Sequence, residues 1–341
     1  MKLFNKSKIE EGNGMYGISI SREGFCVAKT SCSIGEKPEL EICDYSPWAQ
    51  GVPDEKQVKE KIKELDLAAY ACTTVLDIDD YDLLNVEAPE VPEEEVVSAV
   101  RWRISDMVDF DISDAVIDVF ESPVTGGQDN PDNIYVVAAS HETIQQRVSL
   151  LQNAQVQLST IDIPELVLCN LASLLPENEE GIAFLYMMRR QGVMVLIRDS
   201  YVYIARRLDI GLEDLIQVNE GSDQQEPPLI QEANPQLESL VLEMLRTIDY
   251  YDRYFSLTPL SGLVITPMGA ELPGFQQALT RMLGFNVRYL DMNELLDCKT
   301  PMSKALQEES FLAIGATLRI EQEESDEEQG QGEEEFEVAR G

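Results

Sequence analysis

A strand hairpin that occurs twice is the pattern that most constrains this chain. Apolar residues alternate with small or polar ones over residues 15–29, which predicts two short strands joined by a turn at 21–24. A second hairpin is predicted over 182–208, directly after a short, polar and acidic stretch at 176–181. Each hairpin opens a series in which strands and helices alternate, which is typical of α/β domains. The sequence therefore predicts a duplicated architecture of two α/β lobes, for which 341 residues suffice.

Apolar periodicity and turn residues predict the elements around the hairpins. Further strands are expected at about 40–45, 71–78, 82–86, 115–121, 133–139, 157–161, 264–265 and 287–290. Helices are expected at about 54–65, 142–153, 164–175, 236–255, 275–283 and 311–319. The runs 125–133 and 221–235 are rich in turn-forming or polar residues, which indicates exposed segments.

One more helix is predicted to begin at Pro92. Proline loses nothing at the first helical position, and the carboxylates of residues 93–95 favour the positive end of the helix dipole. Apolar side chains then recur on one face, at Val96, Val100, Ile104 and Met107. An aromatic residue on such a helix usually packs inward, so Trp102 is expected in the core or in subdomain packing.

The two lobes are expected at 14–178 and 179–320, with a flexible N-terminus at 1–13. Residues 321–337 hold ten acidic side chains among Gln, Gly and Ser, with Phe336 as the main apolar residue. Such a segment cannot bury enough apolar surface to offset the entropy of ordering. We therefore expect a disordered acidic tail at 321–341.

The charge balance excludes one large functional class. The chain has 63 acidic and 26 basic residues, a formal net charge of −37. A field of that sign repels phosphate backbones, so DNA or RNA binding would lack its main source of affinity. Basic partners, or basic tails of partners, are favoured instead.

Cysteine and histidine usage argues against metal sites and histidine-based catalysis. The only histidine is His141, at an expected helix start. The cysteines form no Cys-x-x-Cys pair and none of the spacings of zinc or iron–sulfur sites. They are scattered among mostly apolar neighbours, at Cys26, Cys32, Cys43, Cys72, Cys169 and Cys298. We therefore expect reduced, buried thiols, no metal site and a reducing compartment.

No membrane-inserted segment is expected. No stretch approaches the roughly 20 apolar residues that span a bilayer, and the start lacks the apolar core of a signal peptide. Leu3, Phe4 and three lysines lie in residues 1–8, where contact with an anionic membrane surface is the alternative to a floppy terminus. The sequence predicts a cytoplasmic protein without direct membrane insertion.

Two stretches carry a family resemblance. Residues 86–95 (Val-Glu-Ala-Pro-Glu-Val-Pro-Glu-Glu-Glu), continued by 99–103 and 115–118, resemble the PilM/GspL family of actin-like cytoplasmic proteins. Residues 161–166 (Ile-Asp-Ile-Pro-Glu-Leu) are similar to the branch of that family that serves MSHA-type pili. The resemblance runs from about residue 16 to 318. It implies an actin-like ATPase fold of two lobes, with a small subdomain inserted into the first lobe at about 92–161.

The resemblance also implies a nucleotide site that has decayed. Nucleotide-binding relatives read Gly-Ile-Asp-Ile-Gly at the first hairpin, where this chain has Ser19 and Ser21 in place of the carboxylate and the second glycine. A carboxylate orders the Mg²⁺, and glycine lets backbone N–H groups approach phosphates. At the second hairpin, bulky Tyr186 and Met188 stand where relatives carry Asp and Gly. The alternative is that Arg189 and Arg190, which follow directly, act as phosphate ligands.

The third element of the nucleotide site is better preserved. Residues 267–275 are similar to the adenosine loop of relatives, although one glycine of the usual pair is missing. Gly269 and Gly274 are expected to serve as structural turn glycines. With three weakened elements, we expect no ATP turnover, no cofactor and no catalytic residue.

The resemblance then leaves recruitment as the expected function. We expect a scaffold of a type IV, MSHA-type pilus assembly platform, peripheral at the inner membrane through its partners. It would bind the cytoplasmic tail of a bitopic PilN-like or MshJ-like protein, in a groove between the first lobe and the subdomain. It would link that protein to the assembly ATPase. The alternative is an ATP-binding actin-like ATPase of a pilus or type II secretion system; a sugar or acetate kinase fits poorly, because no acidic catalytic base stands in a recognisable loop.

Overall fold

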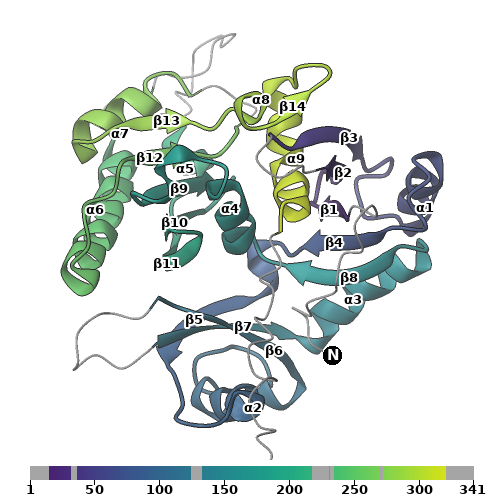
Figure 1. Cartoon of the computed structure of the whole chain (residues 1–341), viewed down its shortest axis with the longest axis horizontal. Coiled ribbons are helices and arrows are strands. Elements are labelled where there is room, and N and C mark those ends of the chain that lie inside the picture. Colours follow the sequence, from purple (N-terminus) through teal and green to yellow (C-terminus); the bar gives the residue numbers. More distant parts are fainter. Residues whose placement is uncertain are drawn as a thin grey trace, which may run out of the picture.

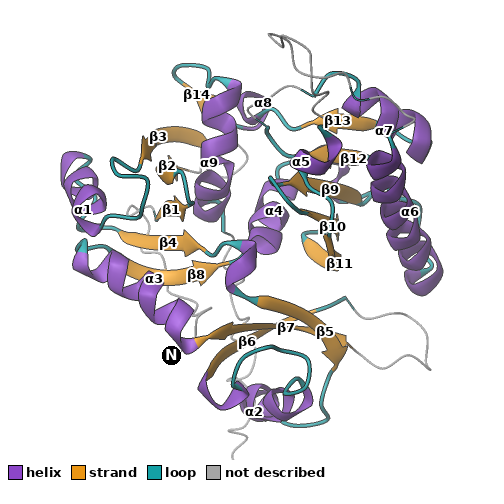
Figure 2. Ribbon diagram, turned by 180° about the vertical axis from the view of Figure 1, so that it is seen from behind, coloured by secondary structure: helices purple, strands orange, loops and turns teal. Residues whose placement is uncertain are grey.

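The computed structural model describes residues 15–31, 37–123, 133–216, 230, 234–268 and 272–319. Three sheets organise this part of the chain, two of them in large lobes and the third in a small subdomain next to both lobes (Figures 1 and 2). The expected terminal segments 1–13 and 321–341 lie outside the described residues, as do Gly269 and most of the runs 125–133 and 221–235. No helix in the described ranges combines the length and the apolar character needed to cross a bilayer.

The first lobe contains a six-stranded mixed sheet. Its strands, in spatial order, are β14 (Asp297–Cys298), β3 (Glu39–Pro47), β2 (Gly24–Ser31), β1 (Tyr16–Ile20), β4 (Ala71–Val75) and β8 (Gln157–Asp162). β1 and β2 form the predicted hairpin, with Ile18 opposite Val27. Successive side chains of a strand point to opposite faces. Phe25 and Val27 accordingly pack with α1 (Glu55–Glu64) and α3 (His141–Asn153) on one face of the sheet. Cys26 and Ala28 point to the other face and pack into the central core between the lobes.

The second lobe contains the second predicted hairpin. Its five strands, in spatial order, are β11 (Tyr201–Leu208), β10 (Gly192–Arg198), β9 (Ile182–Met187), β12 (Leu263–Ile265) and β13 (Val287–Tyr289). Helices α6 (Pro235–Phe255) and α7 (Phe275–Leu283) pack on one face, and α4 (Pro164–Ala172) lies between this sheet and the first lobe. Short helices α5 (Leu212–Leu215) and α8 (Met292–Leu295) were not predicted, because four residues carry no readable periodicity.

The small subdomain begins and ends earlier than the expected 92–161. Its antiparallel sheet has the order β5 (Asp82–Glu87), β7 (Asn133–Ser140) and β6 (Ala115–Glu121), and α2 (Glu93–Arg103) packs on one face. β5 pairs with β7 along its whole length, so the subdomain starts at 82. α3 and β8 instead belong to the first lobe, since β8 pairs with β4. The sheet therefore covers 82–140.

The last helix corrects the expected second lobe of 179–320. α9 (Lys304–Thr317) packs on β1, β2 and β4, and β14 pairs with β3, so the chain returns to the first lobe after β13. A Cβ at Gly17 would lie 2.0 Å from the carbonyl oxygen of Ala313, so only glycine permits this close approach of strand and helix. α9 also starts seven residues before the expected 311. Buried Gln307 and Ser310 interrupt the apolar pattern there, although both are hydrogen-bonded.

Trp102 and Met107 were placed wrongly by the sequence. Trp102 is 77% exposed and Met107 is 50% exposed. Val96, Val100 and Ile104 form the inward stripe of α2, and Trp102 lies about half a turn away from Val100 at about 100° per residue. Met107 follows the end of the helix, so helical spacing no longer applies to it.

Candidate functional site

The first hairpin turn is closed by its own serine. Ser21 Oγ accepts hydrogen bonds from the N–H groups of Glu23 and Gly24, both at 3.2 Å, and Trp48 Nε1 donates to the Ser21 carbonyl at 2.9 Å. Ser19 lies half-buried on β1, between Cys26 of β2 and Val75 of β4. Neither serine supplies a carboxylate, and the N–H groups of Glu23 and Gly24 in this turn are bound by Ser21.

Tyr186 of β9 lies at the junction between the lobes. Its ring packs edge-on against Phe311 of α9, with centroids 5.2 Å apart and an interplanar angle of 77°. Burial raises the pKa of its hydroxyl far above the ordinary value, and the negative charges of Asp77, Glu308 and Glu23 add to that shift. The ring therefore occupies the junction that faces Asp77 and Glu23 of the first lobe.

The rest of the second hairpin is fixed by contacts to both lobes. The backbone of Met188 accepts a hydrogen bond from Leu212 and donates one to Gln191, and its side chain packs against the central core. Gln191 Nε2 donates to Asp79 Oδ1 of the first lobe at 2.7 Å. Tyr186 and Gln191 thus both contact residues of the first lobe.

Arg189 and Arg190 are paired with a carboxylate of their own lobe. Both are exposed, and both pair with Glu213 of α5, Arg190 at 3.5 Å. A shared carboxylate on the same lobe already balances part of their charge. Their geometry gives no support to the alternative that they hold phosphates between the lobes.

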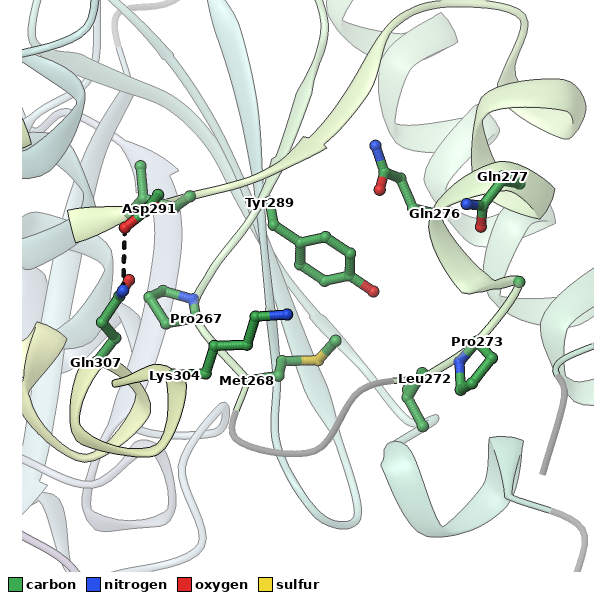
Figure 3. A pocket seen from close by; sticks show the side chains of 12 residues that line it. Pro267, Met268, Leu272, Pro273, Gln276, Gln277, Tyr289, Asp291, Lys304 and Gln307 are labelled. Atoms are coloured by element: carbon green, nitrogen blue, oxygen red, sulfur yellow. Dashed lines mark hydrogen bonds between the residues drawn. The ribbon is translucent and has the colours of Figure 1, made fainter. Parts of the chain in front are cut away.

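The third element borders a cavity of roughly 380 Å³ between the second lobe and α9, at the ends of β12 and β13 (Figure 3). Gly274 stands at the start of α7 with a φ of +86°, a conformation that favours glycine. On the side of the cavity opposite α7, Gln307 of α9 donates a hydrogen bond to Asp291 at 3.0 Å. The wall includes Met268, Leu272, Gln276, Tyr289 and Lys304. The cavity is mixed in character, with apolar side chains beside amide, hydroxyl and ammonium groups.

Two buried carboxylates near the lobe junction were missed as site residues. Asp162, at the end of β8, accepts from the N–H of Ile163 at 2.9 Å and lies 3.5 Å from Arg319. Glu165, at the start of α4, accepts a hydrogen bond from the hydroxyl of Tyr81, and Arg207 of β11 donates to the Tyr81 carbonyl. Burial raises the pKa of both carboxyls. Residues 161–166 carry the shorter family signature, and the structure shows that their acidic side chains are held by protein donors.

The residues of the longer signature organise the small subdomain. Arg101 Nη1 donates to the carbonyls of Ile112 and Ala115, at 2.5 and 3.0 Å. Arg103 reaches back to the carbonyl of Glu87, which precedes the helix. Both arginines therefore satisfy backbone groups at the ends of neighbouring elements.

The small subdomain also contacts the second lobe. Tyr135 Oη of β7 accepts from the N–H of Ala205 at 3.1 Å and donates to the carbonyl of Tyr203 at 3.2 Å. These groups belong to β11, the edge strand of the second sheet. Beside this contact lies a cavity of roughly 170 Å³, lined in part by Asn85, Tyr250 and Tyr254. No local pattern in the sequence predicts this cavity, because residues from five separate segments line it.

No protein-family model and no curated protein matches the chain. Among solved structures, it is similar to a chain of a PilM–PilN type IV pilus biogenesis complex, with 23% identity and a TM-score of 0.68. That likeness covers 89% of this chain and 98% of the other. Lower TM-scores relate it to the cytoplasmic domain of EpsL, an inner membrane component of the type II secretion system of Vibrio cholerae (0.46; 13% identity; 79% and 94% covered). A Bacteroides thetaiotaomicron protein with an actin-like ATPase fold scores 0.45 (8% identity; 83% and 92% covered).

The likeness at a TM-score of 0.68 shows that this chain shares the fold of that chain of the PilM–PilN complex, which agrees with the actin-like fold expected from the sequence. The lobe junction is where such a fold would hold Mg²⁺ and the phosphates of ATP. The residues present there offer a tyrosine ring, a closed serine turn and carboxylates already bound by protein groups. Among the residues that the structure describes, these groups do not fit Mg²⁺ and the phosphates of ATP.

Proposed function

We propose that this protein is a non-enzymatic scaffold of a type IV pilus assembly platform, of the PilM/GspL type and specifically MshI-like, acting at an MSHA-type pilus. It binds the cytoplasmic tail of a bitopic inner-membrane protein, PilN-like or MshJ-like, and links that protein to the assembly ATPase. It resides in the cytoplasm and reaches the inner membrane through its partners. The observation that carries this proposal is the likeness to the PilM–PilN complex over nearly the whole of the matched chain.

The geometry of the lobe junction supports a role without ATP turnover. Tyr186 packs against Phe311 where phosphates would lie, and Gln191 hydrogen-bonds across the junction to Asp79. A protein that must open and close around a nucleotide needs free ligands at this place. Here the side chains stabilise one arrangement of the lobes.

A second candidate is an ATP-binding member of the same fold. One observation favours it, namely the cavity beside α7 at the position of the expected adenosine loop. Its lining offers stacking and hydrogen-bonding groups, including Tyr289 and Gln276. The nucleoside half of a site without its phosphate half binds weakly, because most of the affinity for ATP–Mg²⁺ comes from charged contacts.

The partner tail is proposed to dock between the first lobe and the small subdomain. β6 is an edge strand of the small sheet, and α3 of the first lobe packs next to it. An extended tail beside an edge strand gains main-chain hydrogen bonds, and alternate side chains enter pockets. The acidic body selects for basic residues in that tail.

Membrane fractionation tests the proposal. Expressed alone, the protein should remain in the soluble fraction, and co-expression with the bitopic protein of its pilus system should move it to the membrane fraction. A version of that partner without its cytoplasmic tail is the matched control and should leave the protein soluble. Equal membrane recovery with and without the tail would overturn the proposal.

A further inference from the structure

The outer face of α2 carries the most exposed large hydrophobic side chain in the described part of the chain. Trp102 is 77% exposed, compared with 57% for Val52 and 52% for Tyr250. The indole is not needed for the fold of the subdomain, since Val100 and Ile104 form the buried stripe of this helix. Tryptophan is costly to leave in water and is enriched among residues that dominate protein interfaces.

Helix periodicity places a suitable surface beside the indole. Ser98 and Ala99 precede Trp102 by four and three residues, so two small side chains lie next to it on the same face. Glu95, three residues before Ser98, lies on the same face of the helix and is exposed. A long side chain that lies over the indole can cross the small residues and reach the carboxylate.

The charge of the subdomain defines the kind of partner. Residues 82–140 contain 14 acidic residues, two arginines and no lysine. Both arginines, Arg101 and Arg103, donate to backbone carbonyls within the subdomain. Exposed carboxylates flank Trp102 on both sides along the chain, at Glu93, Glu94, Glu95, Asp106 and Asp109.

We propose that Trp102 anchors an arginine-containing basic segment of a second cytoplasmic protein on the outer face of α2. A guanidinium group stacks on an indole ring, and the neighbouring carboxylates attract its charge. A second copy of this chain would present the same negative surface, and an anionic membrane would be repelled. Charge complementarity therefore selects a basic protein segment over these occupants.

This surface is separate from the groove proposed for the membrane partner. In both views the small sheet lies between α2 and the two lobes (Figures 1 and 2). The two sites can therefore be occupied together, and loss of one interaction does not imply loss of the other. Variants at Trp102 should retain recruitment to the membrane by the bitopic partner.

Intrinsic fluorescence gives a direct test, because the chain has two tryptophans and Trp48 is buried. The W48F full-length variant leaves Trp102 as the reporter. It should show a saturable emission change when titrated with the acetylated peptide (Arg-Ala)₆, and none with (Glu-Ala)₆. Where W48F fails to fold, the parent protein is used with 5-fluorotryptophan, and the ¹⁹F signal of Trp102 is assigned by its loss in W102A.

The matched comparison is W102A against Y250A, which removes an exposed aromatic ring elsewhere. W102A should weaken (Arg-Ala)₆ binding at least tenfold by calorimetry, whereas Y250A should leave it unchanged. Equal affinity of W102A and parent would overturn the proposal, since the peptide would then bind the acidic body without the indole.

Photo-crosslinking identifies the natural occupant. With p-benzoylphenylalanine at position 102, the cross-linked segment should come from another protein and contain arginine. A cross-link to a second copy of this chain, or to lipid, would overturn the proposal in favour of that occupant.

Discussion

The ring of Tyr186 meets the ring of Phe311 at 77°, with centroids 5.2 Å apart, and this contact joins the second hairpin to the helix that returns to the first lobe. Edge-to-face packing of this kind contributes about 0.5–1.5 kcal/mol beyond the area that it buries. The two residues are 125 positions apart in the chain. Their contact explains why a bulky side chain at the expected phosphate position is compatible with a stable fold.

We expect ATP–Mg²⁺ to bind negligibly. By the family resemblance, a nucleotide site needs carboxylates and glycines at the positions that Ser19, Ser21, Tyr186 and Met188 hold here. Titration calorimetry with ATP and Mg²⁺ measures this directly, and ATP without Mg²⁺ is the control. Magnesium-dependent binding in the micromolar range would contradict the prediction and favour the ATPase alternative.

Packing at the lobe junction predicts the effect of changing Tyr186. Y186A removes a half-buried ring that packs on the central core, and should lower the free energy of unfolding by about 2–4 kcal/mol. Y186F keeps the ring and should change it by less than about 1 kcal/mol. Chemical denaturation of the three proteins gives the values. A large loss in Y186F would show that the hydroxyl, and not the ring, is the stabilising group.

Asp77 predicts a pH dependence of stability near the same junction. Burial raises its pKa from 3.8 to about 6 in the folded protein, against the attraction of Arg147. Between these two values the folded state holds a proton that the unfolded chain has released. Stability should therefore fall as pH rises from about 4 to 6, and D77N should lack that loss.

Denaturation at pH 4 and pH 6.5 measures this difference between D77N and the parent. The variant should gain on the order of 1–2 kcal/mol relative to the parent over this interval. Asp162 and Glu165 also have raised pKa values, but both are present in each protein and cancel in the comparison. D106N, which removes an exposed carboxylate, is the control. If the parent instead gained stability relative to D77N as the pH rises, the predicted direction of the pH dependence would be wrong.

Short-range patterns predicted most of the strands and helices, because the hairpins and amphipathic helices repeat within a few residues. The return of α9 to the first lobe could not be predicted in this way. It depends on the contact of Gly17 with Ala313, almost 300 residues apart, and on buried polar residues that interrupt the apolar pattern. For the same reason, the sequence did not assign β5 to the small subdomain: its pairing with β7 joins segments far apart in the chain and leaves no local signal.

The sequence identified some residues of the candidate site but not the contacts that they make. Ser21 and Tyr186 were identified from the residues that they replace; the structure places Ser21 in the first hairpin turn and Tyr186 against Phe311 of α9. Tyr81 and Glu165 were not identified, because their hydrogen bond joins segments 84 residues apart. Trp102 was misjudged because its residue type was weighed above its position, although it lies off the apolar face that Val100 and Ile104 define.

Removing the acidic tail should leave the fold and partner binding intact. A chain that ends at Ile320 loses the ten acidic residues of 321–337 but loses almost no apolar surface. Thermal melts of the full and shortened proteins should nearly coincide, within about 2 °C. A shortened protein that no longer unfolds cooperatively would show that the tail contributes to the folded structure.

Direct attraction to anionic lipid should be too weak to hold this protein at a membrane. The three lysines in residues 1–8 each contribute only about 1 kcal/mol near an anionic surface. The net charge of −37 opposes them. In a sedimentation experiment with phosphatidylserine-rich vesicles, the isolated protein should remain in the supernatant at physiological salt. The variant K2A/K6A/K8A should behave like the parent, because the lysines are not the source of membrane residence. Tight sedimentation of the parent that the triple variant lost would mean that the N-terminus binds lipid, and recruitment through a partner would then be unnecessary.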